Sequence, residues 1–195
     1  MRVCALVLTI GLVCAAGFAS AQDAAYIHHI EGLSPANPHE MIAGSPVTIY
    51  YNFRVESACL QSGGMSLRFY SPDGADWGDV NMSHNYDMYD MTVNPLTLGG
   101  DPGIDDDTLG LWINDKAECR LPVGFDDWLV KLFFEFPESS TGKTFCIDST
   151  YFSHAGPWSW NLGDGSTAVP QWDGPYCFTV VGCCYDYKGD ANLDG

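Results

Sequence analysis

Residues 47–55 read VTIYYNFRV, and this stretch decides the fold class. Its odd-numbered positions are apolar or aromatic, and between them lie Thr48, Tyr50, Asn52 and Arg54. A period of two residues is typical of a β-strand with one buried face, because successive side chains leave a strand on opposite sides. The stretch therefore predicts a strand that lies half in a core and half in solvent.

The same alternation recurs along the chain. It predicts further strands at residues 65–70 and 128–136, and shorter ones at 26–30, 109–114, 144–148 and 176–181. In the stretch 128–136, one buried face is predicted to hold Trp128, Val130, Leu132, Phe134 and Phe136, with Lys131 and Glu135 on the opposite face. Turn-forming sequences separate the strands, namely residues 71–74 (SPDG), 94–95 (NP), 99–102 (GGDP) and 173–175 (DGP). No segment has an amphipathic helical period with caps at both ends.

Many short strands without helices to cover a parallel sheet predict an all-β fold. We expect an antiparallel β-sandwich of the immunoglobulin-like or jelly-roll type, formed by residues 22–181. This length is sufficient for one domain with its own core. Trp77, Trp112 and Trp128 are expected in that core.

The N-terminus has the pattern of a secretory signal peptide. Arg2 precedes the apolar stretch 3–18, and the small residues Ala19, Ser20 and Ala21 precede Gln22. Residues 1–21 are therefore expected to be removed on export. No later stretch has the apolar length of a membrane span. We expect a secreted, extracellular protein, with association to a cell surface left open.

The cysteine content fits an oxidising compartment. Outside the signal peptide the chain has six cysteines, Cys59, Cys119, Cys146, Cys177, Cys183 and Cys184. An even number in an exported chain favours disulfides, and their spacing does not match a zinc site. We favour a bridge between Cys59 and Cys119, with the other cysteines clustering near the C-terminal strand. The adjacent Cys183 and Cys184, in a linker at residues 182–188, are expected to reach separate partners.

The charge excludes two classes of partner. Removal of Arg2 with the signal peptide leaves seven basic residues against 25 acidic ones, a net charge of −18. Such a field repels nucleic acid and anionic membranes, so neither is expected as a partner.

The last seven residues, 189–195 (GDANLDG), match the first half of a calcium-binding loop. Asp190, Asn192 and Asp194 occupy the first, third and fifth ligand positions, and Gly195 provides the sharp turn. The motif resembles the start of a type I dockerin repeat. This resemblance implies a Ca²⁺-binding helix-loop-helix repeat that docks onto a cohesin-type module. Without the carboxylate of the twelfth loop position, this chain is expected to hold calcium weakly.

The sandwich itself resembles the cohesin-like and carbohydrate-binding modules of secreted bacterial proteins. Together with the dockerin-like motif, it predicts a non-catalytic interaction or structural protein that docks into an extracellular assembly, linked to polysaccharide binding or degradation. A carbohydrate-binding module is the first alternative and a glycoside hydrolase or other secreted hydrolase the second. No GxSxG or HExxH motif is present, and no short motif selects a catalytic carboxylate pair. The five histidines are expected in surface or loop positions.

Three tryptophans are candidates for ligand binding. Trp158, Trp160 and Trp172 lie in turn-rich segments, where indole faces can stack on sugar rings or fill a partner's pocket. Burial of Trp158 and Trp160 in the core explains the same spacing, and the sequence slightly favours it.

Two other patterns stay open in the sequence. A secondary calcium site in a loop at residues 101–107 would use Asp101, Asp105, Asp106 and Asp107. An ordinary acidic loop is the favoured interpretation of this segment. The triplet Asn81-Met82-Ser83 fits the acceptor pattern for N-glycosylation.

Overall fold

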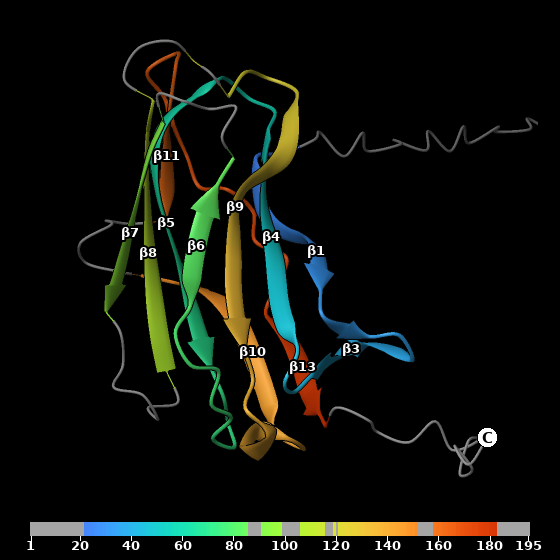
Figure 1. Cartoon of the computed structure of the whole chain (residues 1–195). Helices are drawn as coiled ribbons and strands as arrows, with labels where there is room; N and C mark the ends of the chain where they lie inside the picture. The colour runs from blue at the N-terminus through green and yellow to red at the C-terminus, as the bar shows by residue number, and fades with distance from the viewer. Residues whose placement is uncertain are drawn as a thin grey trace, which may run out of the picture.

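The protein is an all-β sandwich of two sheets (Figure 1). The computed structural model describes residues 22–85, 91–98, 106–115, 119, 121–151 and 158–182. The four-stranded sheet has the order β1 (Ala24–Glu31), β4 (Pro46–Val55), β9 (Phe125–Glu135) and β6 (Asn81–His84). Within the described residues, no helix is long and apolar enough to cross a membrane.

The nine-stranded sheet lies behind it in Figure 1. Its main path runs through β12 (Thr167–Ala168), β11 (Ser159–Leu162), β5 (Leu60–Tyr70), β10 (Thr144–Thr150), β13 (Tyr176–Val181), β3 (Asn37–Ile42) and β2 (Leu33–Ser34). From β5 a branch continues to β8 (Asp106–Asp115) and then to β7 (Met91–Leu98). All strand pairs are antiparallel except β13 with β3, which run parallel.

The predicted fold class and the predicted strands are confirmed. In β4 the alternation works as expected, since the side chains of Val47, Ile49, Tyr51, Phe53 and Val55 are all 0% exposed. Burial of such side chains is the main source of free energy for a sandwich of this size. The decisive stretch therefore forms the centre of the core, flanked by β1 and β9. The predicted calcium repeat lies outside the described residues.

Aromatic rings fill the core between the sheets. Phe145 of β10 lies at the centre, 5.1 Å from Trp77 and from Phe136 and 6.1 Å from Phe69, measured between ring centroids. Trp77 is 2% exposed, as the sequence predicts. The contacts with Trp77 and Phe136 are edge-to-face, and that with Phe69 is stacked. Aromatic pairs of both kinds add to the free energy of area burial.

The prediction for Trp128 is wrong because β9 contains a β-bulge. Tyr51 pairs with Val130, whereas Asn52 pairs with Trp128, so Leu129 is the extra residue. An extra residue in a strand reverses the face of the sheet to which every earlier residue of that strand points. Leu129 and Val130 are both buried, and Trp128 lies half-exposed on the outer face. Trp112 is also half-exposed rather than a core residue.

The predicted turn at Asn94 and Pro95 is also wrong. Both residues lie within β7, where Asn94 pairs with Trp112 and Pro95 with Leu111 of β8. A proline removes one ladder donor, so it is tolerated where a strand has a neighbour on one side only. In the described part of the chain, β8 is the only strand that pairs with β7.

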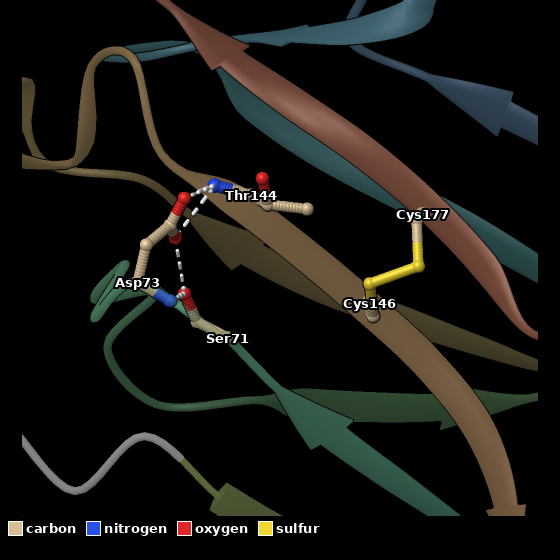
Figure 2. Close-up of a disulfide and its surroundings, with 5 residues drawn as sticks. All are labelled: Ser71, Asp73, Thr144, Cys146 and Cys177. Atoms are coloured by element: carbon tan, nitrogen blue, oxygen red, sulfur yellow. Dashed lines mark hydrogen bonds between the residues drawn. A yellow bond between two sulfur atoms is a disulfide. The ribbon is translucent and has the colours of Figure 1, made fainter.

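The turn at residues 71–74 follows β5 on the way to β6 and is hydrogen-bonded to the start of β10 (Figure 2). The two carboxylate oxygens of Asp73 accept hydrogen bonds from the Thr144 amide at 2.8 and 3.1 Å. The Ser71 hydroxyl donates to the same carboxylate at 2.9 Å and accepts from the Ala75 amide at 2.7 Å. The hydrogen bond from the Thr144 amide holds the pKa of Asp73 below its ordinary value, and the hydrogen bond from Ser71 lowers it further. This turn therefore fastens two strands of one sheet together.

Candidate interaction surfaces

The outer face of the four-stranded sheet carries aromatic and cationic side chains together. Tyr50 and Arg54 of β4 point outward, as the alternation predicts, and Tyr26 is opposite Asn52 in the β1–β4 register. The bulge in β9 adds Trp128 to this face, and Lys131 of β9 pairs with Tyr50 of β4. We call Tyr26, Tyr50, Arg54, Trp128 and Lys131 the aromatic–cation face.

One half of this face is centred on Lys131. Its Nζ lies 4.5 Å from the ring centroid of Tyr50 and 4.4 Å from that of Trp128. The two rings are 5.9 Å apart and almost perpendicular. The Tyr50 hydroxyl donates a hydrogen bond to Glu31 at 2.8 Å. Cation–π attraction thus holds the ammonium group over both rings, which restricts all three side chains.

The other half is centred on Tyr26. The Arg54 Cζ lies 5.8 Å from its ring centroid, and its hydroxyl donates to the carboxylate of Asp126. Burial raises the pKa of Tyr26, and the hydrogen bond to Asp126 raises it further, so the phenol stays protonated at neutral pH and keeps donating its O–H to Asp126. Tyrosine, tryptophan and arginine are the residue types enriched where proteins contact one another. The face can therefore offer ordered rings and donors to a partner.

Trp160 cannot bind a ligand in this structure, which corrects one of the three tryptophan candidates. Its side chain is 0% exposed, and its indole N–H donates to Met65 Sδ at 2.9 Å. The ring lies 5.8 Å from Phe53, inside the sandwich. Trp160 is thus a core residue, the interpretation that the sequence slightly favours.

Trp158 and Trp172 lie side by side, half-buried, with 5.8 Å between their rings. The indole N–H of Trp158 donates to the Pro170 carbonyl at 3.1 Å, and that of Trp172 donates to Asp148 Oδ1 at 2.9 Å. Trp172 also contacts Tyr176, at 5.3 Å between ring centroids. Both indole donors are satisfied within the protein, so a ligand would meet ring carbon atoms only. Their role in binding stays a prediction.

The two predicted calcium sites fall largely outside the described residues. Asp190, Asn192 and Asp194 lie there, as do Asp101 and Asp105. Asp106 and Asp107 begin β8 and pair with Tyr70 and Phe69, so the predicted loop at residues 101–107 ends before them. Within the described residues, no group of three or more His, Cys, Asp and Glu side chains is arranged to hold a metal ion. Both calcium sites stay predictions.

Two disulfides staple the described part of the chain. Cys59 is joined to Cys119, the pair that the sequence favours, with 5.2 Å between their Cα atoms. Cys146 of β10 is joined to Cys177 of β13 (Figure 2), with Cα atoms 4.2 Å apart. This second bridge is the cluster expected at the C-terminal strand. Cys183 and Cys184 lie outside the described residues.

A shallow groove of about 690 Å³ lies between β1, β3 and the start of β13. Its lining combines apolar residues with His28, His29 and His39. These three histidines and His84 are exposed, as expected, and His154 lies outside the described residues. The exposed imidazoles make the groove polar at its rim.

The sequence places three of the five residues of the aromatic–cation face outward. The alternation does so for Tyr50 and Arg54 in residues 47–55 and for Lys131 in residues 128–136. In the second stretch it assigns Trp128 to the core, because the bulge falls within the apolar run Trp128, Leu129 and Val130. That run, which breaks the strict alternation, is the signal of the phase shift. Tyr26 joins the face through the β1–β4 register.

The chain matches no protein-family profile and no curated protein sequence. Its fold is similar to a chain of a type I cohesin–dockerin complex from Clostridium thermocellum, with TM-score 0.53 and 16% identity over 84% of this chain and 98% of that one. The sixth cohesin of scaffoldin B from Acetivibrio cellulolyticus has TM-score 0.51 and 11% identity over 82% and 99%. The seventh type I cohesin of ScaB from Pseudobacteroides cellulosolvens has 0.50 and 9% over 82% and 93%. The sandwich therefore has a fold similar to that of cohesin modules.

Proposed function

We propose that this protein is an exported, non-catalytic interaction module of an extracellular assembly. The observation that carries the proposal is the similarity of its sandwich to cohesin modules over nearly their whole length. Two of these structures contain cohesins in complex with dockerins, so a protein partner is the kind of ligand that this fold accommodates. The ordered rings and cations of the aromatic–cation face are suited to such a contact.

The C-terminal motif adds a second mode of attachment to the proposal. In it, Asp190, Asn192 and Asp194 would contribute oxygen ligands for calcium, and the dockerin-like motif would dock onto a cohesin-type module. Oxygen ligands from carboxylates and amides are those that Ca²⁺ prefers. A protein with both parts would link two components of one assembly, for which a polysaccharide is the expected substrate.

The test is capture of the full-length, naturally exported protein on immobilised cohesin modules, with calcium and then with EDTA. We expect binding in calcium that is lost in EDTA and in the double variant Asp190→Ala/Asp194→Ala. Asp79→Ala is the matched control, because it removes an exposed carboxylate far from the motif in sequence. Capture that does not depend on calcium or on the two substitutions would contradict the docking role.

A carbohydrate-binding module is the alternative, and the half-buried Trp158 and Trp172 are its basis. The same protein would be mixed with insoluble polysaccharides in EDTA and sedimented. Our proposal predicts that the sandwich stays in solution. Sedimentation that is weakened by Trp158→Ala or Trp172→Ala would favour the alternative instead. Release of reducing sugars that survives EDTA and disappears on a single carboxylate substitution would point to a hydrolase.

A further inference from the structure

The triplet Asn81-Met82-Ser83 is the only Asn-x-Ser/Thr sequence in the 195 residues. It forms the start of β6, which is the last strand of the four-stranded sheet and, among the described strands, pairs with β9 alone. In N-glycosylation the asparagine amide receives the sugar, and the hydroxyl two residues later completes the acceptor pattern. Both groups must therefore be accessible from one side of the backbone.

The strand places these two groups on the same, outer side. Met82 packs against the hydrophobic core and pairs with Leu132, which is 0% exposed. Residues two apart in a strand share a face, so Asn81 and Ser83 both lie opposite to the core. The core contact of Met82 fixes this phase, since a shift by one residue would expose Met82 and bury both acceptor groups.

The surroundings of Asn81 leave room for a sugar. Its side chain is exposed, and its carboxamide makes no hydrogen bond within the described residues. A hollow of about 390 Å³ opens beside it, lined by Phe133, Pro46 and Asp79 among others. Phe133 is half-exposed and lies directly across the β6–β9 register from Asn81. Cross-strand neighbours share a face, so a sugar on Asn81 would lie on this ring.

We infer that Asn81 is the acceptor of an N-linked glycan that lies over Phe133 at the β6 edge. The donor class is an oligosaccharide carried on a polyprenyl pyrophosphate. The Asn81 Nδ2 forms a bond to the anomeric carbon, the bond from that carbon to the pyrophosphate oxygen breaks, and the lipid pyrophosphate leaves. The amide proton passes to a base of the transferase. The inference rests on the export that the proposed function includes.

The test is mass spectrometry of the protein secreted by the organism that encodes it. We expect the peptide that contains Asn81 to carry hexose and N-acetylhexosamine masses, and a peptide N-glycosidase to convert Asn81 to aspartate. Asn81→Gln and Ser83→Ala should each abolish the added mass completely. Ser83→Thr keeps the hydroxyl and should retain it. Asn161→Gln, an exposed asparagine outside the pattern, is the control and should leave the mass of the glycan unchanged.

The outcomes separate this inference from the proposed function. An exported protein whose Asn81 is unmodified overturns the glycan and leaves the interaction role intact. A protein retained in the cell with residues 1–21 attached overturns export, and the glycan with it. Thermal unfolding of each variant shows whether a lost glycan reflects misfolding, and Ser83→Thr keeps the test decisive if Ser83→Ala does not fold.

Discussion

Gly63 and Gly163 each allow a bulky neighbouring group to pack directly against the backbone. A Cβ atom on Gly63 would lie 2.6 Å from Cδ1 of the buried Trp160. On Gly163 it would overlap Cys59 Sγ and lie 2.7 Å from Cys119 Sγ. Gly163 also donates its amide to the Cys59 carbonyl at 2.8 Å. At both positions the absence of a side chain is what admits the neighbouring group.

We predict that Gly163→Ala lowers the free energy of unfolding by about 1–3 kcal/mol, because the new methyl group collides with the sulfur atoms of the disulfide. In the background Cys59→Ala/Cys119→Ala the sulfur atoms are gone, and the same substitution should cost clearly less. Urea denaturation of the four proteins in this double-mutant cycle measures the coupling. Equal losses in both backgrounds would show that the contact with the disulfide is not the cause.

Among the strands, the register of β1 and β9 on β4 and the bulge in β9 decide which side chains lie on the outer face of the four-stranded sheet. The bulge at Leu129 brings Trp128 out of the core and over Lys131, and β1 adds Tyr26 beside Arg54. A regular β9 would bury Trp128 and leave Lys131 over one ring only. One inserted residue thus makes the difference between an ordinary polar sheet face and the aromatic–cation face.

The turn at residues 71–74, in the connection from β5 to β6, carries a pH-dependent prediction. Asp73→Ala should lower the free energy of unfolding at neutral pH by about 1 kcal/mol, because the Thr144 amide loses its acceptor. The pKa of Asp73 is depressed in the folded protein, so its stabilising effect is present above the ordinary pKa of an aspartate and is lost as the pH falls through the folded-state pKa.

The measurement is denaturant unfolding of the native protein and Asp73→Ala from neutral pH down to pH values below the ordinary aspartate range. The gap between the two proteins should narrow as the pH falls. Asp79→Ala, which removes another exposed carboxylate of the same connection, should show a much smaller gap. A gap that widens on acidification would contradict the assignment of the hydrogen bond to an ionised carboxylate.

The charge of the whole molecule also has a consequence for stability. A net charge of −17 makes the compact state repel itself, and salt screens this repulsion. We predict that the thermal unfolding midpoint rises with NaCl, by about 2–4 °C for each kcal/mol of repulsion removed. Differential scanning calorimetry in NaCl and KCl at equal ionic strength checks this. A midpoint that falls with salt would mean that attractive ion pairs dominate.

Calcium can be separated from this general effect in the same experiment. CaCl₂ and MgCl₂ at equal ionic strength screen charge alike. A larger midpoint shift in CaCl₂ would indicate a selective site, as proposed for the C-terminal motif, because a ligand that binds only the folded state raises its stability.

The sequence by itself determined the fold class, the seven strands that its alternation predicts and the burial of β4. These depend on a period of two and on turn formers, which are local properties of the chain. It also placed Tyr50 and Arg54 outward and favoured the Cys59–Cys119 bridge. The tertiary structure alone decided the bulge in β9, the strand position of Pro95 and the grouping of Tyr26, Trp128 and Lys131 on one face. Those features depend on which strands become neighbours and in which register, and that is set by contacts between residues far apart in the chain.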